Sequence, residues 1–534
     1  MISDPTTQDR PPRFLEAILL AVAFALAYTQ SPLYFSNQNQ YFLHGLAQGG
    51  LGHLNRDWLA QTRDPTPIFT ALVSAGYRKL GEISFQVAYF LLLMWYFLSV
   101  RWLVGKLPKV PDTRPFRVAF AAGFIATHAA ILRVASVQLT GVDYPWNLQA
   151  GVAGQYLLGA GLQPSAFGAL LMTAVAAFAS RRPTLAAFLA ASSCAFHSTY
   201  LLPAGLLVLG FMVETLRATP HSGPTAFRML LAASAIVAPV CVYILFTFGP
   251  TNPDIFEQSQ HILAETRIPH HCEIDRWFDV VAGMQLTWAA IGLVLLRRSP
   301  LFVALAVAAG VGVALTLIQY ATDNPTLALM FPWRISALLV PMASAVIVAK
   351  TVALLPPSRW VVWVAGAVVL ALAGAGVWVI VERLGYRSGD DEQQLYEYVR
   401  AHAGPGDVYL LPVRVPAVGN GRGSISTSFT PPPRPKPGSN LIPVDLQRFR
   451  LHTGTPIYVD FKSVPYADVE VMAWLQRVRQ CEEWYGGNWS RSVVEFDLKR
   501  EGITHVIAPA SQPIAVSYLE EVHSDPAYIV YRLK

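Results

Sequence analysis

Long stretches of uncharged apolar residues recur through the first 381 residues of this 534-residue chain. A membrane-spanning helix needs about 20 mostly apolar residues, and this requirement predicts about 11 transmembrane helices. Only 14% of the residues are charged, against about 25% in soluble proteins, which argues against a disordered, coiled-coil or nucleic-acid-binding chain. The predicted spans are residues 14–35, 82–104, 116–136, 164–180, 184–198, 199–216, 227–248, 277–296, 301–320, 331–354 and 359–381.

The basic residues of this region predict how the helices are oriented. Lys and Arg gather in short segments such as 101–117, 181–182 and 297–298, which an 11-span arrangement places on one face. Cytoplasmic loops carry an excess of Lys and Arg, so this face and the N-terminus are predicted to be cytoplasmic. An odd number of spans then puts everything after residue 381 outside. The net charge of +6 therefore reflects orientation in the membrane, and no nucleic acid is expected as a partner.

The predicted external face is much larger than the cytoplasmic one. It comprises segments 36–81, 137–163 and 249–276 and the C-terminal residues 385–534. In the C-terminal part, strand patterns at 407–412, 456–461, 503–508 and 527–533 alternate with helical patterns at 390–402 and 467–480, which predicts a small, largely parallel sheet. The sequence thus predicts a transmembrane domain, 1–384, with a long first external loop, 36–81, and an extracytoplasmic α/β domain, 385–534.

Two of the four cysteines lie on this external face. Cys272 is in the third external segment and Cys481 in the C-terminal domain. Disulfides persist in oxidising compartments, so one linking these two segments is a hypothesis that the sequence leaves open.

The first external loop contains the acids that are best placed for chemistry. Asp57 and Asp64 are seven residues apart, so in a helix both would face the same way. Pro65 and Pro67 favour a helix that ends near Asp64, and Arg63 lies directly before that acid. The alternative is an interfacial helix whose charged side chains are simply solvated.

Further ionisable residues lie near the predicted outer boundary of the membrane. They are Arg133 in the third span, Asp143, Arg267 and His270 in the external segments, and Arg334 at the start of the tenth span. Ionisable groups at membrane depth are costly and usually line a polar cavity. Alternatively, a long side chain such as that of Arg133 can extend its charged end to the interface.

By architecture the whole chain resembles the GT-C superfamily, the integral-membrane glycosyltransferases that use polyprenyl-phosphate-linked sugars. The shared features are a cytoplasmic N-terminus, a long first external loop that contains acids, about ten further helices and an external C-terminal domain. In that family an acid of the first loop acts as general base or binds a metal, and here Asp57 matches it, with Asp64 second. The chain departs from the family where an acid often precedes a Tyr, because it has Asn37, Gln38, Asn39 and Gln40 before Tyr41.

The resemblance implies an inverting sugar transfer at the extracytoplasmic face of a bacterial-type inner (plasma) membrane. A carboxylate, Asp57 or Asp64, would take the proton of the acceptor hydroxyl. The side chains of Arg63, Arg133, Asp143, Arg267, His270 and Arg334 are the expected substrate-binding groups, with the cations holding the phosphate leaving group. The expected partners are a lipid-phosphate sugar donor, membrane lipid and a glycan, lipid or protein acceptor. No cofactor is required by the pattern, although the family resemblance leaves a divalent cation, Mg²⁺ or Mn²⁺, open.

Three other functions fit the same sequence. A polysaccharide polymerase or ligase also works on lipid-linked sugars but uses Arg and His rather than an acid. A transporter of lipid-linked sugars would have ionisable residues near the middle of the membrane and internal repeats, and the sequence shows no clear repeat. The last alternative is a non-catalytic receptor or assembly factor that uses the C-terminal domain for binding.

Overall fold

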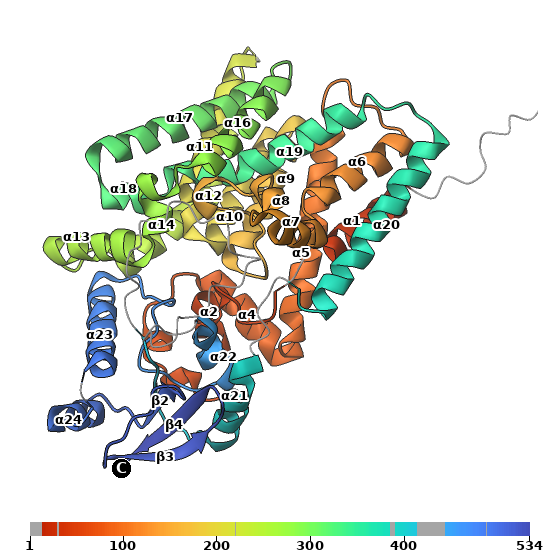
Figure 1. Ribbon diagram of the computed structural model, residues 1–534. Coiled ribbons are helices and arrows are strands. Elements are labelled where there is room, and N and C mark those ends of the chain that lie inside the picture. The colour runs from red at the N-terminus through yellow and green to blue at the C-terminus, as the bar shows by residue number, and fades with distance from the viewer. Residues whose placement is uncertain (1–12, 29–30, 219, 385–389, 414–443, 488) are drawn as a thin grey trace, which may run out of the picture.

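The computed structural model describes residues 13–28, 31–218, 220–384, 390–413, 444–487 and 489–534. A large array of apolar helices forms one end of the molecule, and a smaller domain that contains the β-sheet forms the other (Figure 1). Each part has its own hydrophobic core. One core is built mainly from residues 20–373, and the other from residues 395–531 together with Leu263.

The helical array contains an apolar helix at each of the predicted spans. Among the described residues, six helices are long and apolar enough to cross a membrane. Four further apolar helices have only 10–17 residues. The helices of the array are α1 (Arg13–Ala27), α5 (Ile83–Val104), α6 (Arg114–Ala126), α7 (Ala130–Thr140), α9 (Ala169–Ala179), α10 (Pro183–Phe196), α11 (Leu201–Ala218), α12 (Gly223–Phe248), α16 (Val280–Leu295), α17 (Leu301–Thr322), α19 (Ser336–Val352) and α20 (Arg359–Val381).

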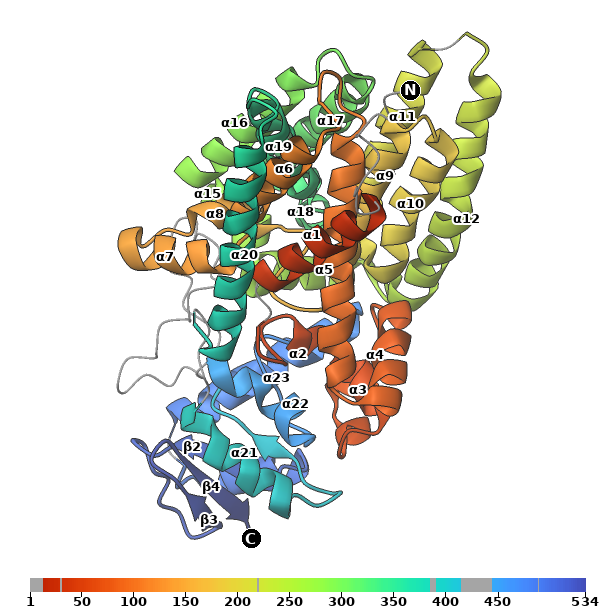
Figure 2. The same cartoon turned by 90° about the vertical axis from the view of Figure 1, so that its right-hand side faces the viewer.

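The predicted third span, 116–136, is not one straight helix. It is divided into α6 and α7, which meet at an angle of 44°. Ala129 between them has extended backbone angles, so the helical hydrogen bonding is interrupted there. Figure 2 shows α7 lying across the direction of α5 and α20, which places Arg133 outside a continuous span.

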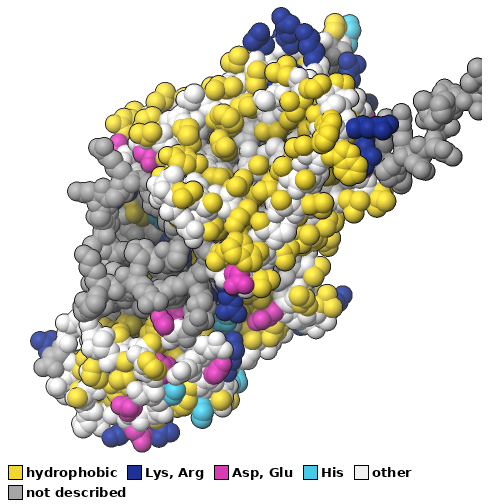
Figure 3. Space-filling model, turned by 45° about the vertical axis from the view of Figure 1, so that its right-hand side comes forward, with side chains coloured by type: hydrophobic (Ala, Val, Ile, Leu, Met, Phe, Trp, Pro, Cys, Tyr) yellow, Lys and Arg dark blue, Asp and Glu magenta, His cyan; other side chains and the backbone are white. Residues whose placement is uncertain are grey.

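The distribution of charge along the molecule follows the two parts. In Figure 3 the surface of the helical array is mostly hydrophobic, and Lys and Arg side chains gather at its end away from the sheet domain. Acidic, basic and His side chains are mixed over the sheet domain and the band where it meets the helices. This separation agrees with basic loops on one face, while the orientation in a membrane stays a prediction.

The C-terminal domain has a mixed sheet, so the predicted largely parallel sheet is wrong. Its strands β1 (Tyr409–Leu410), β2 (His505–Pro509), β3 (Leu519–Ser524) and β4 (Tyr528–Leu533) have the order β1-β2-β4-β3, and only β1 and β2 pair in parallel. Three residues join β3 to β4, and so short a connection requires antiparallel strands. The helices are α21 (Asp390–His402), α22 (Phe449–Thr453), α23 (Asp468–Gly486) and α24 (Ser492–Arg500).

The predicted strand at 456–461 makes only one isolated bridge, between Ile457 and Tyr409. Two backbone hydrogen bonds with Tyr409 hold it beside β1, from Tyr409 N–H to Pro456 O and from Tyr458 N–H to Tyr409 O. Between them the Ile457 N–H donates to the Asp57 carboxylate, so the segment joins the edge of the sheet to the first external loop.

The first external loop packs between the helical array and the C-terminal domain. It contains the helices α2 (Gln38–Tyr41), α3 (Leu43–Gly49) and α4 (Pro67–Leu80). Its backbone touches the C-terminal domain at Gly52, and His53 N–H donates to Gly454 O at 2.7 Å. A Cβ on Gly52 would lie 2.3 Å from the same oxygen, so only glycine fits this approach.

The second and third external segments are also built from short helices. They comprise α8 (Tyr144–Asn147), α13 (Pro253–His261), a π-helical turn (Ile262–Arg267), α14 (Pro269–Cys272) and α15 (Ile274–Trp277). α18 (Pro325–Leu329) and a 3₁₀ turn (Pro332–Ile335) precede α19. Cys272 and Cys481 lie in different hydrophobic clusters and both are free thiols, so the hypothetical disulfide is not formed.

Candidate active site

A cavity of about 460 Å³ lies where the C-terminal domain meets the ends of the helices. Its walls come from the first external loop, from residues 154–156, from the start of α11 and the end of α12, from the π-helical turn and α14, from residues 326–334 and from the segment 462–466. Segments that are distant in sequence thus meet around one space, which is typical of a functional site.

Three permanent or potential cations line this cavity: Arg267, Arg334 and Lys462. The Arg334 side chain is 7% exposed and donates to Gln155 Oε1 at 2.7 Å. Its guanidinium also lies 4.9 Å from the centre of the Tyr200 ring. Arg267 donates to the backbone oxygen of Lys462, and Nε of both arginines has no hydrogen-bond partner among the described residues. Both arginines therefore keep donor capacity for a ligand.

Asp460 attracts both Arg267 and Lys462, but it does not line the cavity. Among the described residues that line the cavity none is Asp or Glu. Like charges in a partly desolvated site repel one another, which is costly unless an anion binds between them. Nor do the described residues bring three His, Cys, Asp or Glu side chains together in a group that could hold a metal ion. The cavity walls therefore fit an anion and do not fit a divalent cation.

The electrostatics of the cavity lower the pKa of its basic groups. Desolvation, followed by repulsion from Arg267, lowers the pKa of the half-buried Lys462 to about 7. The pKa of His270 is lowered mainly by the neighbouring His271, and desolvation lowers that of His271 to about 4. Both imidazoles are therefore neutral near pH 7, whereas the Lys462 amine changes its charge there.

The amides that replace the expected family acid lie at this cavity. Asn37 and Gln40 line it, and Asn37 Nδ2 donates to the Tyr156 hydroxyl at 3.4 Å. Gln40 exchanges two hydrogen bonds with the backbone of Val464, at 2.6 and 2.9 Å. The segment 37–40, where the resemblance led us to expect an acid, thus reaches the cavity through Asn37 and Gln40. Both side chains are neutral, and Gln40 is hydrogen-bonded to Val464 on the opposite wall.

One side of the cavity is apolar and is formed by ends of membrane helices. Leu201 and Leu202 of α11, Ile244 and Phe248 of α12 and Met330 contribute to it. Met330 is itself 47% exposed on the outside of the molecule. A ligand with a charged head and a hydrocarbon chain would match both sides of this space.

Three residues beside the cavity have left-handed backbone angles, as do several residues elsewhere, such as Lys109 and Arg181. Ser36, Ala153 and Phe331 have φ values of 50°, 56° and 51°, which are rare for residues with a side chain. Each lies within a residue or so of the cavity wall, and Phe331 starts the 3₁₀ turn that presents Arg334. Strained conformations persist where the surroundings enforce them and are frequent at functional sites.

Asp57 does not line the cavity. Its side chain is 0% exposed and pairs with Arg450 at 2.9 Å. The carboxylate also accepts from the N–H groups of Leu59, at 2.9 Å, and Ile457, at 3.0 Å. Two 3₁₀ turns surround it in place of the helix considered from the sequence. Asp57 is therefore enclosed between the first loop and the C-terminal domain.

Asp64 is adjacent in sequence to residues that line the cavity, whereas Asp57 is not. The next two residues, Pro65 and Thr66, line it, and the Asp64 carboxylate accepts from Thr66 N–H at 2.9 Å. Arg63, in contrast, is exposed; its guanidinium donates to Thr247 O and its N–H to Glu470.

Arg133 and Asp143 form a separate buried pair. Arg133 NH2 lies 2.7 Å from Asp143 Oδ2, with side-chain exposures of 0% and 2%. The guanidinium also lies 4.6 Å from the centre of the Trp146 ring, and Asp143 caps α8 through Trp146 N–H. Neither residue lines the cavity, and their contacts join α7 to the second external segment.

Of the residues expected from the sequence, Arg267, His270 and Arg334 meet at the cavity. Sequence reasoning missed Lys462, which belongs to the other domain. A signal for it exists, because it directly follows the strand-like run 456–461. Residues that follow a strand often lie at a domain edge, but nothing local in the sequence indicates that this edge faces Arg267.

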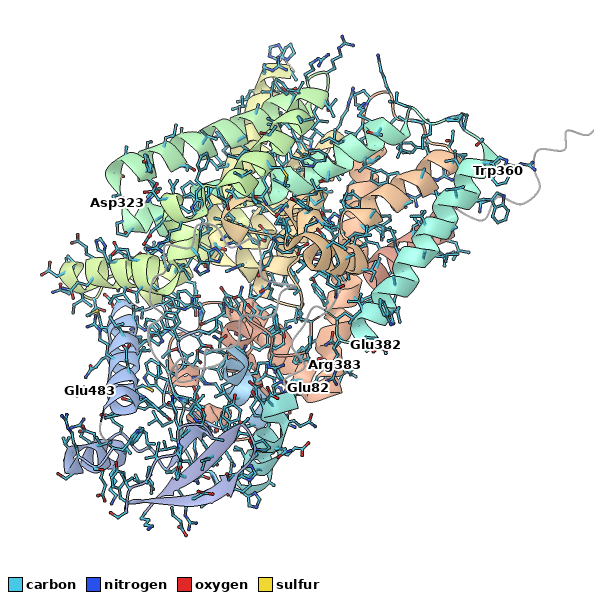
Figure 4. The ribbon with its side chains drawn as sticks, viewed as in Figure 1. Glu82, Asp323, Trp360, Glu382, Arg383 and Glu483 are labelled. Atoms are coloured by element: carbon cyan, nitrogen blue, oxygen red, sulfur yellow. The ribbon has the colours of Figure 1, made fainter. Side chains whose placement is uncertain are left out.

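A second cleft, of about 670 Å³, lies between α5, α20 and α21. Figure 4 shows Glu82 and Arg383 at this corner of the molecule. The cleft is lined by carboxylates, including Glu82 and Glu397, as well as by Arg400 and Arg448. Because side chains of both signs line this cleft, it does not favour an anion, although its volume exceeds that of the cationic cavity.

Comparisons with known proteins give matches to a family model and to solved structures. A domain of unknown function, DUF6798, matches residues 435–481, a range that includes Arg450 and Lys462. The crystal structure of ArnT from Cupriavidus metallidurans bound to undecaprenyl phosphate matches with a TM-score of 0.44 and 11% identity, covering 97% of this chain and 97% of that chain. The likeness to ArnT is one of overall architecture, and no residue of this chain takes a role from it. No curated protein matches the chain.

Proposed function

We propose that the chain is a membrane glycosyltransferase that moves a sugar from a polyprenyl-phosphate donor to an acceptor at the extracytoplasmic face. The observation that carries the proposal is the cationic cavity. It combines Arg267, Arg334 and Lys462 with no carboxylate, and one of its walls is made of apolar helix ends. A lipid-linked phosphate is the ligand class that has both properties.

In this proposal the phosphate lies between the three cations and the lipid chain leaves along the apolar wall. When the bond between the sugar and the phosphate breaks, negative charge develops on the phosphate oxygens. Guanidinium groups that are already in place stabilise that charge without reorganisation. The guanidinium groups of Arg267 and Arg334, which line the cavity, are suited to this role.

The acceptor hydroxyl must lose a proton as it attacks the sugar. We assign this proton to Asp64, because the residues that follow it line the cavity whereas Asp57 is enclosed by Arg450 and backbone amides. General-base catalysis of this kind contributes typically about 10²–10⁴-fold. A single direct displacement inverts the configuration of the sugar carbon.

A polysaccharide polymerase or ligase is the second candidate. The observation in its favour is the composition of the cavity, which contains Arg267, Arg334, His270 and His271 but no acid. Both candidates use a lipid-linked sugar donor, so they differ in the acceptor, which is a glycan chain in the second case.

The binding step can be tested without knowing the sugar. The purified protein in nanodiscs is titrated with geranylgeranyl phosphate, and binding is followed by intrinsic tryptophan fluorescence. We expect saturable binding that is lost in the double variant Arg267→Gln/Arg334→Gln. The matched control is Arg400→Gln, which removes a cation from the second cleft. Equal binding by the wild type and the double variant would contradict the proposed site.

A further inference from the structure

The C-terminal domain contributes one wall of the cavity through residues 460–466, which bend at 461 and 462. Lys462, Val464 and Tyr466 line the cavity, whereas Ser463 and Pro465 are buried and do not line it. The bend is closed by the Asp460 carboxylate, which accepts from Ser463 N–H. The position of the segment therefore decides where the Lys462 amine lies.

A buried group of three charges holds the start of this segment. Arg450, which is 2% exposed, lies 2.9 Å from the Asp57 carboxylate and 3.0 Å from the Asp460 carboxylate. The side chains of Asp57 and Asp460 are 0% and 1% exposed. One arginine of the C-terminal domain thus links an acid of the first external loop to the first residue of the segment.

The segment is held at further points beyond this group. The Asp460 carboxylate accepts from Ser463 N–H, and its backbone oxygen accepts from Trp474 Nε1 at 2.9 Å. Gln40 of the first loop holds Val464 by two hydrogen bonds. In contrast, the Lys462 side chain has no carboxylate within ion-pair distance among the described residues. The backbone is therefore fixed while the amine is left for a ligand.

We propose that Asp57, Arg450 and Asp460 are positioning residues, which place Lys462 and Tyr466 at the phosphate of a lipid-linked substrate. This inference rests on the proposed function and gives Asp57 a role other than that of the base. If Asp57 were the base, its loss would reduce turnover and leave lipid binding intact. As a positioning residue, its loss moves the segment and weakens binding instead.

The first test reads the position of Lys462 without any ligand. The full-length wild type and Asp57→Asn are treated with an amine-reactive ester, and the labelling of each lysine is followed by peptide mass spectrometry. We expect the labelling rate of Lys462 to change several-fold in Asp57→Asn, because both the access to the amine and its pKa depend on its position, while the rate of Lys534 at the C-terminus is unchanged. Asp254→Asn, which alters an exposed acid, should leave both rates unchanged. An unaltered Lys462 rate in folded Asp57→Asn would overturn the inference, whether or not the protein binds lipid phosphates.

The second test separates positioning from catalysis. The dissociation constant for geranylgeranyl phosphate should rise about tenfold or more in Asp57→Asn, the effect expected when one charged contact to a phosphate is lost. The charge-free triple variant Asp57→Asn/Arg450→Gln/Asp460→Asn loses both ion pairs that hold the segment and should bind no more tightly than Asp57→Asn. With a donor that is turned over, Asp57→Asn should raise KM and keep kcat at saturation, and a lowered kcat with unchanged binding would refute the positioning role.

The Asp57→Asn protein can fail to fold, because it weakens a buried contact between the first external loop and the C-terminal domain, although Arg450 keeps Asp460 as its charge partner. In that event Asp57→Glu keeps the charge and displaces it by one methylene, and the same labelling measurement applies. A changed Lys462 rate in Asp57→Glu supports the inference, and a rate equal to the wild type contradicts it. If the wild type itself does not bind geranylgeranyl phosphate, the proposed function fails while the labelling result still stands.

Discussion

Binding of a lipid phosphate should depend on pH through Lys462. Burial and the neighbouring Arg267 lower the pKa of this amine to about 7 in the free protein. A phosphate anion in the cavity favours the ammonium form and raises the same pKa. Binding therefore takes up a proton at pH values above 7, and the affinity falls as the pH rises.

The size of this effect follows from the pKa. When the bound form stays protonated, the apparent dissociation constant is multiplied by 1 + 10^(pH − pKa) of the free amine. For a pKa of 7, the ratio between pH 8.5 and pH 6.5 is about 25, or about 1.9 kcal/mol. His271 has a pKa of about 4 and that of His270 is also lowered, so both stay neutral in the free protein over this interval.

The assay uses a lipid phosphodiester, because its single charge does not change in this range. Its affinity for the protein in nanodiscs is measured at pH 6.5 and 8.5, and proton uptake is measured calorimetrically in two buffers with different ionisation enthalpies. Lys462→Met should bind weakly at both pH values, whereas Lys462→Arg should keep its affinity at pH 8.5 because arginine stays charged. A wild-type affinity that is flat across this interval, or a pH dependence that persists in Lys462→Met, would refute the reasoning.

Three further changes have defined outcomes. Arg334→Gln should weaken lipid-phosphate binding by about 1.5–3 kcal/mol, the usual range for a hydrogen bond to a charged group, and Arg334→Lys should recover only part of it in the same titration. Asp143→Asn leaves Arg133 buried without its charge partner and should destabilise the fold by about 3–5 kcal/mol, seen as a lower melting temperature, while lipid binding below that temperature is kept. Gly52→Ala should increase protease cleavage between the two parts, because its Cβ would lie 2.3 Å from Gly454 O; a cleavage pattern like that of the wild type would argue against a close backbone contact there.

The helical array and part of the site could be predicted from local sequence. Apolar runs report burial in lipid wherever they occur, so the predicted spans coincide with apolar helices even where the helix is short or bent. A charged side chain next to an apolar run raises the free energy of the folded protein unless it binds a partner or a ligand. Arg334 and Arg267 were therefore expected at the site. That reasoning needs no knowledge of the partner residue.

Local sequence gives no way to foresee that Arg133 and Asp57 lie away from the cavity. A charge at membrane depth can be satisfied by another residue as well as by a ligand, and the sequence does not distinguish the two cases. Arg133 is satisfied by Asp143, ten residues away, and Asp57 by Arg450, almost 400 residues away. Contacts at such separations leave no periodic pattern in the sequence, and for the same reason Lys462 was missed.

The separation of the cavity residues along the chain has a thermodynamic consequence for the proposed binding. Arg334 and Arg267 belong to the part built on the membrane helices, and Lys462 belongs to the C-terminal domain, so an anion bound in the cavity would contact both. A ligand that requires the docked arrangement must stabilise it, by about 2.7 kcal/mol when its concentration is 100 times its dissociation constant. Without the ligand, the repulsion among three cations works against docking, and the buried group of Asp57, Arg450 and Asp460 acts in the opposite direction. Docking of the C-terminal domain and binding of the lipid phosphate are therefore linked equilibria, and residues that never touch the substrate can alter its affinity.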